Sequence, residues 1–143
     1  MKKLLLPGLA ALCLTTSDAW AQRVKSGDVP APVKLALMSK YPAAKGVSWE
    51  KEKGNYEANW GGKSGEDNSV QFTPDGAFVE KVDAIPVSSL PPGVAAYVKA
   101  HYPGVKITEA GKVTDAKGRT LYEAEVKGKD LLFDEKGEFI KKD

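Results

Sequence analysis

Few side chains in this sequence have the type and spacing that catalysis requires. His101 is the only histidine, so a single imidazole is available as a base and no histidine cluster can hold a metal ion. A catalytic histidine also needs a group that orients it and a group on which it acts, and the sequence around His101 offers neither. A half-exposed position on a helix is therefore the favoured interpretation. The alternative, a catalytic base, would require a turnover that is lost when His101 is changed.

Carboxylates are the second set of side chains that could transfer protons. Glu57 with Asn59, and Glu123 with Glu125, alternate along predicted strands, so each pair projects from the polar side of its strand. Paired carboxylates perform acid–base chemistry when one of them is desolvated. On an open sheet face they are expected to stay hydrated, where they serve solubility or contact with a partner.

Two loop segments resemble ligand-binding motifs only superficially. Residues 66–68 (EDN) lack the alternating oxygen ligands and the later bidentate glutamate of a calcium loop. Residues 61–65 (GGKSG) have the wrong spacing for a phosphate-binding loop, and no helical pattern follows them. Since no nucleophile elbow or dinucleotide fingerprint occurs either, we predict no catalytic residue, no metal and no cofactor. The chain is not expected to be an enzyme.

The N-terminus has the pattern of a secretory signal. Lys2 and Lys3 precede an apolar run that is shorter than the ~20 residues needed to span a bilayer. Small residues at both ends of residues 19–21 (AWA) suit a signal peptidase. We expect a signal peptide over residues 1–21, no membrane span after its cleavage, and a periplasmic or secreted product. Cys13 is removed with the leader, so the mature chain has no cysteine for a disulfide or a metal site.

The mature chain is nearly neutral. Removal of Lys2, Lys3 and Asp18 leaves 21 − 2 = 19 basic and 19 − 1 = 18 acidic residues, a net charge of about +1. The two signs alternate along the sequence, as in residues 50–53 (EKEK). Such a mixed surface lacks the basic stripe that a phosphate backbone requires, so nucleic acid is not an expected partner.

The elements that must position these side chains occur twice in the sequence. The clearest matches are Tyr-Pro at 41–42 and 102–103, and Tyr-Glu-Ala at 56–58 and 122–124. The first pair is offset by 61 residues and the second by 66, so the length difference falls in a hairpin loop. We infer a duplication, with repeats at about 28–83 and 89–142 in a single domain that spans residues 22–143.

Each repeat begins with a helical pattern and continues with the alternation typical of strands. Val33 and Leu37 lie on one helical face, and Asp28 and Ser89 are placed as N-caps of the two helices. Short connections favour antiparallel strands, and one helix can cover only one face of a sheet. We predict an α+β fold in which a helix followed by about four antiparallel strands occurs twice. The result is a roughly eight-stranded antiparallel sheet with both helices on one face and a hydrated polar face opposite.

These motifs resemble the PepSY-like family of small bacterial envelope proteins. The resemblance covers nearly all of residues 29–142 and rests on the Tyr-Pro helix end, Trp49-Glu50, the Tyr-Glu-Ala strand and the Phe-x-x-x-Gly turn at residues 72–76. The second repeat departs from it, with Glu109-Ala110 where a Trp-Glu pair is expected. The resemblance implies a fold like that of β-lactamase-inhibitor protein and an exported binding or inhibitory module. It supplies no catalytic residues.

The remaining candidates are side chains for contact with a partner. Trp49 and Trp60 have no aromatic counterpart in the second repeat, and a tryptophan near a strand end can anchor an interface. The predicted interaction surface comprises Trp49, Glu57, Asn59, Trp60, Glu123 and Glu125. We expect a non-catalytic interaction module of the cell envelope, of the hydrolase- or protease-inhibitor kind, that binds another envelope or secreted protein. The alternative is a periplasmic carrier or sensor of a small ligand.

Overall fold

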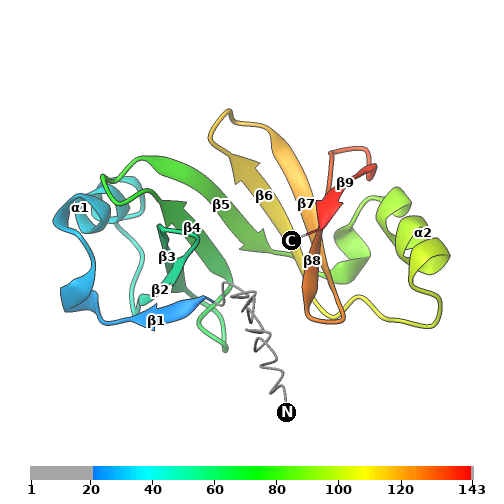
Figure 1. The fold of residues 1–143 in the computed structure, drawn as a ribbon, viewed down its shortest axis with the longest axis horizontal. Coiled ribbons are helices and arrows are strands. Elements are labelled where there is room, and N and C mark those ends of the chain that lie inside the picture. The colour runs from blue at the N-terminus through cyan, green and yellow to red at the C-terminus, as the bar shows by residue number, and fades with distance from the viewer. Residues whose placement is uncertain (1–20, 143) are drawn as a thin grey trace, which may run out of the picture.

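One antiparallel sheet runs through the whole described chain (Figure 1). The structure, a computed structural model, describes residues 21–142, so the predicted leader and its Cys13 lie outside the described residues apart from Ala21. Among the described residues, nine strands pair in sequence order: β1 (Gln22–Val24), β2 (Ser48–Glu52), β3 (Asn55–Trp60), β4 (Asn68–Phe72), β5 (Phe78–Ala84), β6 (Ala110–Asp115), β7 (Thr120–Val126), β8 (Lys129–Phe133) and β9 (Phe139–Lys142). The predicted α+β class with a large antiparallel sheet is confirmed. The added strand is β1, whose three residues are too few for alternation to reveal.

The same order of elements occurs twice along the sheet. Helix α1 (Ala31–Lys40) precedes β2–β5, which we call the first unit, and α2 (Pro92–His101) precedes β6–β9, the second unit. Short 3₁₀ turns, η1 (Ser26–Asp28) and η2 (Val87–Ser89), lead into the helices. Figure 1 shows the helices at the two outer ends of the molecule, with the sheet between them.

The helices begin later than the sequence predicts. Asp28 and Ser89 were expected as N-caps, and this is wrong: both lie in the 3₁₀ turns, and the N-cap positions are Pro30 and Pro91, without a side-chain cap. A proline fixes its own φ and so defines the chain direction into the first helical turn. Asp28 is itself part of the 3₁₀ turn η1, where its N–H donates to the carbonyl oxygen of Lys25.

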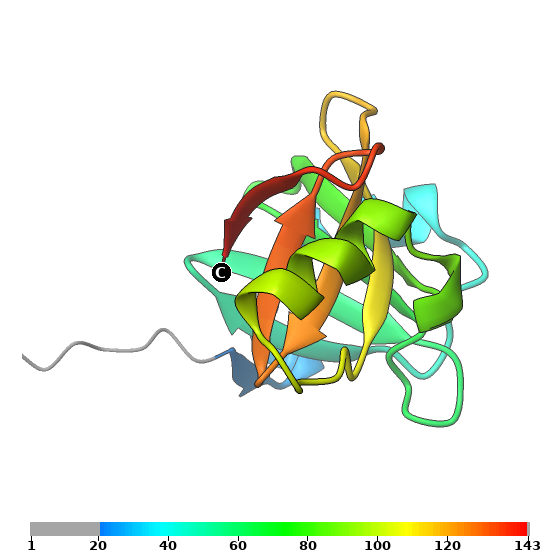
Figure 2. The same ribbon diagram turned by 90° about the vertical axis from the view of Figure 1, so that its right-hand side faces the viewer.

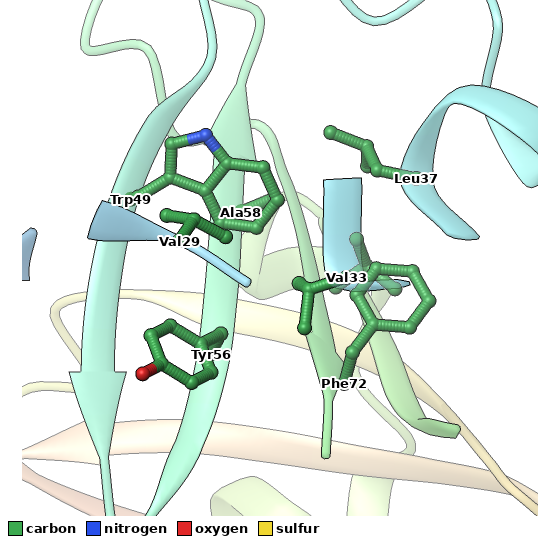
Figure 3. Close-up of a cluster of buried hydrophobic side chains, with 8 residues drawn as sticks. Val29, Val33, Leu37, Trp49, Tyr56, Ala58 and Phe72 are labelled. Atoms are coloured by element: carbon green, nitrogen blue, oxygen red, sulfur yellow. The ribbon is translucent and has the colours of Figure 1, made fainter. Parts of the chain in front are cut away.

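The first hydrophobic core lies between α1 and one face of the sheet (Figure 3). Val33 and Leu37 of α1 pack with the strand residues Trp49, Ala58 and Phe72, all of which are buried. These strand residues alternate with polar ones, as period-two side-chain orientation requires. The middle of the helix-facing side of β2–β4 is therefore occupied by the packing of this core.

The second core has the same plan and one substitution of consequence. Val94 and Val98 of α2 pack against strand residues of β7 and β8 that include Phe133, and Figure 2 shows α2 across these strands. Trp49 pairs with Ala58 in the first unit, whereas Ala110 takes the equivalent place opposite Ala124 in the second. The second core therefore lacks an indole at this position.

Two larger side chains of the loop before β6 offset part of that loss. Val105 and Ile107 pack against the second core, at positions where the first repeat has Ala44 and Gly46 at the same offset of 61. The second core is thus filled in part by residues whose counterparts in the first repeat are smaller.

A glycine turn joins helix and sheet in each unit. Gly76 (φ +86°) and Gly137 (φ +84°) stand in the turns before β5 and β9. A Cβ atom on Gly76 would lie 2.7 Å from the carbonyl oxygen of Pro32, and one on Gly137 would lie 3.1 Å from the Cα atom of Gly93. Each turn therefore packs its backbone directly against the first turn of its helix, a contact that only glycine allows.

Candidate binding cleft

The pleat of the sheet separates charges that alternate in the sequence. In β2, Glu50 and Glu52 project from the face opposite α1, while Lys51 lies on the helix side with its Nζ 5.4 Å from the ring of Tyr56. Successive side chains of a strand point to opposite faces, so a Glu-Lys alternation becomes a face of glutamates and a face of lysines. The evenly mixed surface expected from the sequence is wrong for the open face of this sheet.

The open face forms a cleft of about 550 Å³ to which both units contribute. Among the described residues, nine carboxylates and two lysines, Lys53 and Lys141, line it. The carboxylates are those of Glu50, Glu52, Glu57, Glu66, Glu80, Glu109, Glu123, Glu125 and Asp130. Eight of the ten glutamates of the chain are in this set, although the formal net charge of the whole sequence is +2. We call this surface the acidic cleft.

Like charges lie directly opposite each other within the acidic cleft. Glu50 on β2 pairs in register with Glu57 on β3, and Glu125 on β7 pairs with Asp130 on β8. Carboxylates in direct cross-strand register repel each other and destabilise the pair. One such pair stands in each unit, so the repulsion is distributed across the cleft.

The repulsion and the partial burial of these groups change their acidity. Burial raises the pKa of Glu50, and the Glu57 and Glu66 carboxylates raise it further, while Arg23 lowers it. Burial likewise raises the pKa of Glu109, with added contributions from Glu125, Glu66 and Asp130. Glu66 acts on a residue of each unit, so the loop between β3 and β4 brings its carboxylate near the junction of the two units.

Hydrogen bonds fix the positions of several cleft residues. The Asn59 Nδ2 donates to Glu57 Oε1 at 3.0 Å, and the Gln71 Nε2 donates to Glu57 Oε2 at 3.1 Å. In the second unit, the Thr108 hydroxyl donates to Glu125 Oε1 at 2.7 Å. Asn59 is itself buried, with 5% of its surface exposed. Both oxygens of Glu57 are thus held in one orientation.

The structure brings together four of the six residues predicted for the interaction surface. Glu57, Asn59, Glu123 and Glu125 all line the acidic cleft. Trp49 does not, because it lies in the first core with 5% of its surface exposed. Its side chain is unavailable for contact with a partner while the protein is folded.

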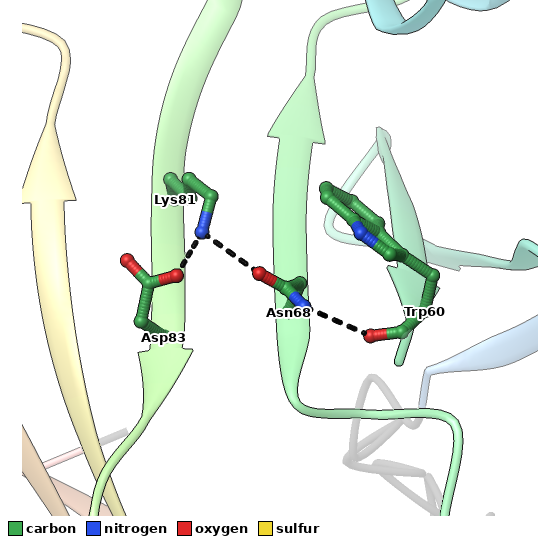
Figure 4. A network of polar contacts seen from close by, with 4 residues as sticks. All are labelled: Trp60, Asn68, Lys81 and Asp83. Atoms are coloured by element: carbon green, nitrogen blue, oxygen red, sulfur yellow. Dashed lines mark hydrogen bonds and ion pairs between the residues drawn. The ribbon is translucent and has the colours of Figure 1, made fainter. Parts of the chain in front are cut away.

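Trp60 belongs to a polar network on the helix side of the sheet (Figure 4). Its carbonyl oxygen accepts a hydrogen bond from Asn68 Nδ2 at 3.3 Å, and Asn68 Oδ1 accepts one from Lys81 Nζ at 3.2 Å. Lys81 also forms an ion pair with Asp83. The ring of Trp60 lies 5.5 Å from that of Tyr41, whose pKa is raised by burial and by the nearby Asp83. Trp60 is therefore half-buried in a structural cluster, on the opposite side of the sheet from the cleft.

Five cleft glutamates are not part of the interaction surface predicted from the sequence. They are Glu50, Glu52, Glu66, Glu80 and Glu109. Alternation in residues 50–53 predicts that Glu50 and Glu52 share one face of a strand. The pairing of β2 with β3 shows that this is the face of Glu57. Glu66 and Glu109 come from loops, and only the fold shows that they approach the same cleft.

His101 is exposed on α2, away from the acidic cleft. Its ring stacks on that of Tyr97 with 3.9 Å between centroids, and its Nδ1 lies 2.9 Å from the Tyr97 carbonyl oxygen. Within residues 21–142, no group of three or more histidine, cysteine, aspartate or glutamate side chains is arranged to hold a metal ion. The helices of this described part are also too short and too polar to cross a membrane.

The fold and the cleft together define a class of small α+β proteins in which one long antiparallel sheet carries helices on one face and an open polar cleft on the other. The chain belongs to the family described as "Putative beta-lactamase-inhibitor-like, PepSY-like", whose model matches residues 61–141. The resemblance noted from the sequence motifs is thereby confirmed. No curated protein matches this chain.

Solved structures from Bacteroides share the fold. A "putative periplasmic" protein of Bacteroides eggerthii is 25% identical with a TM-score of 0.65, over 80% of this chain and 88% of that one. A DUF2874 family protein of Bacteroides uniformis is 27% identical with a TM-score of 0.64, over the same shares. A BLIP-like protein of Bacteroides fragilis is 21% identical with a TM-score of 0.58, over 80% of this chain and 85% of that one. In agreement with the predicted leader, the protein is periplasmic or secreted.

Proposed function

We propose that this protein is a non-catalytic interaction module of the cell envelope that binds another protein in the acidic cleft. The observation that carries the proposal is the cleft itself, a concave face of about 550 Å³ built from both units and opposite to the helices. The inhibitor-like description of the family supports a role in binding proteins. A hydrolase or protease of the envelope is the kind of partner that this description suggests.

Some residues of the cleft lower the stability of the folded protein. A like-charged cross-strand pair costs roughly 0.2–1 kcal/mol relative to a neutral one, and the cleft contains two, Glu50 with Glu57 and Glu125 with Asp130. Departures from local stability are expected at functional sites. The cost therefore supports a role for these carboxylates beyond keeping the protein in solution.

The test is to capture a partner and then locate its binding surface. Immobilised residues 22–143 are exposed to native envelope extract, and a retained protein is purified and titrated against the module by calorimetry. Ser69→Trp places an indole within the cleft without changing charge, and Ser88→Trp adds the same bulk to an exposed position in η2. We expect Ser69→Trp to abolish binding and Ser88→Trp to preserve it. Equal binding by both variants would place the interface elsewhere.

A small-ligand carrier or sensor is the second candidate. The cleft volume of about 550 Å³ falls in the range of small-molecule sites, roughly 300–1,000 Å³. Such sites are mostly apolar, however, whereas this cleft is lined mainly by charged and amide side chains. A metabolite that raises the melting temperature of the wild type, and not that of Ser69→Trp, would favour the carrier.

A further inference from the structure

We infer that the acidic cleft receives a lysine- or arginine-rich segment of the partner protein. This inference rests on the proposed function and specifies the chemistry of the partner. It follows from the charge of the cleft, the extent of the surface and the fixed orientation of its carboxylates.

The charge of the cleft opposes that of the rest of the chain. Nine carboxylates and two lysines give the lining a formal charge of −7. Because residues 22–143 carry a net charge of about +1, the mature residues outside the cleft carry about +8. A concave surface with one sign of charge focuses its field outward and attracts the opposite charge. Complementary charge across an interface also selects among partners, so a cationic segment fits this surface and an acidic or neutral one does not.

The extent of the cleft favours a segment rather than a single cation. Its carboxylates extend from Glu50 on β2 to Asp130 on β8, which are six strand spacings apart in the sheet order. At about 4.8 Å per spacing, this is roughly 29 Å measured along the sheet. An extended chain rises about 3.3 Å per residue, so about nine residues would cross the strands. Carboxylates from both units can then meet basic side chains of one continuous segment.

The orientation of the carboxylates suits guanidinium and ammonium groups. Glu57 is held by Asn59 and Gln71, and Glu125 is held by Thr108. Carboxylates with fixed geometry form short charge-assisted hydrogen bonds with Arg and Lys, and the ordering cost is reduced because the acceptors are already in place.

The distribution of the acidic residue types separates this face from ordinary surface charge. Asp115 and Asp134 accept backbone N–H groups in the β6–β7 and β8–β9 turns, where they fix the turn. The glutamates instead gather in the cleft, and the two outside it, Glu135 and Glu138, flank a single turn. Those two exposed glutamates provide a matched control for changes within the cleft.

The raised pKa values of two cleft glutamates provide an independent readout. Burial and neighbouring carboxylates raise the pKa of Glu50 and of Glu109. A bound cation favours the ionised form and lowers these pKa values again. Binding in mildly acidic buffer therefore releases protons, and calorimetry in two buffers of different ionisation enthalpy measures that release.

The experiment titrates a fluorescent octalysine peptide, with a neutral Gly-Ser octapeptide beside it, into residues 22–143. We expect octalysine alone to bind, and its affinity to fall about tenfold or more when salt rises from about 20 to about 200 mM, as exposed charge contacts are screened. Glu50→Gln with Glu109→Gln should weaken binding about tenfold, the combined effect of two partly exposed charge contacts. Glu135→Gln with Glu138→Gln removes the same charge and should change affinity less than about twofold.

Several outcomes would overturn the inference. These are no binding of octalysine at low salt, an equal loss of affinity in the two double variants, or binding of spermine as tight as that of octalysine. Concentration-dependent dimerisation that is lost in the cleft variant would instead assign the cleft to a second copy of this chain. An envelope partner blocked by Ser69→Trp, yet indifferent to salt and to the Glu50→Gln/Glu109→Gln change, would leave the proposed function standing without its cationic segment. Octalysine binding with no envelope protein retained would support the preference for a cationic segment and count against the proposed function.

Discussion

Glu50 and Glu57 face each other in direct register across β2 and β3, on the open side of the sheet. Glu57 is held in place by two amide donors, from Asn59 and Gln71, whereas the pKa of Glu50 is raised by burial and then by Glu57. The pair therefore destabilises the folded protein mainly when Glu50 is ionised.

Glu50→Gln should stabilise the protein near neutral pH by roughly 0.2–1 kcal/mol. The folded-state pKa of Glu50 lies above its ordinary value of 4.5, so ionisation costs stability above the folded pKa, and this cost disappears as pH falls to 4.5 and below. Urea denaturation at about pH 7 and about pH 4 should show a gain at the higher pH and almost none at the lower. Glu138→Gln, at an exposed position, serves as the control. A gain that is constant with pH would show that repulsion is not its cause.

Trp49→Ala should be among the most destabilising single changes in the mature chain. The indole is 5% exposed and packs in the first core, and truncation of a buried large aromatic residue costs roughly 3–5 kcal/mol. Trp60→Ala removes a half-buried ring and should cost less. Chemical denaturation of both variants gives the comparison. In Trp60→Phe, the fluorescence of Trp49 should be blue-shifted and resist quenching by acrylamide; ready quenching would contradict its burial.

Gly76→Ala and Gly137→Ala should each destabilise the protein by more than Gly118→Ala. All three glycines have positive φ, for which a side chain costs about 1–2 kcal/mol. A Cβ at Gly76 or Gly137 also meets the first turn of a helix, whereas nothing lies within 4 Å of one at Gly118. Thermal melting of the three variants tests this order. An equal loss of melting temperature in the three variants would mean that the turns at Gly76 and Gly137 are not closely packed against the helices.

Asn68→Ala should destabilise the first unit by about 1–2 kcal/mol, because it removes two hydrogen bonds worth about 1 kcal/mol each. Lys81 keeps its ion pair with Asp83, so affinity for octalysine should not change. Denaturation and peptide titration measure the two effects separately. A loss of peptide affinity would show that the Trp60 side of the sheet also contributes to binding.

Period-two alternation was enough to predict much of the fold from the sequence. Glu57, Asn59, Glu123 and Glu125 could be assigned to one polar face because each stands two residues from a partner in a strand. The helices were recognised from their apolar faces, but their starts were not. Proline and a preceding 3₁₀ turn took the places expected for side-chain caps.

The acidic cleft itself could not be predicted, because it depends on pairing and curvature. Sequence order shows Glu50 and Lys51 as neighbours, and only the pairing with β3 shows that Glu50 faces Glu57. Glu66 and Glu109 belong to different units and come close only in the folded sheet, where both act with other carboxylates on the same surface. The expectation that Trp49 contacts a partner is wrong for a related reason. Its lack of a counterpart reflects a differently filled core, with Val105 and Ile107 in the second unit, and does not mark an interface.

The separation of charge between the two faces gives the molecule a permanent electric dipole, even though its net charge is small. A protein of this kind is turned by the field of an approaching partner before any contact is made, so a larger fraction of collisions is productive. Beside a negatively charged surface the same dipole directs the helices toward that surface and the cleft away from it. The charge of the two faces thereby gives the molecule a preferred orientation beside a charged surface.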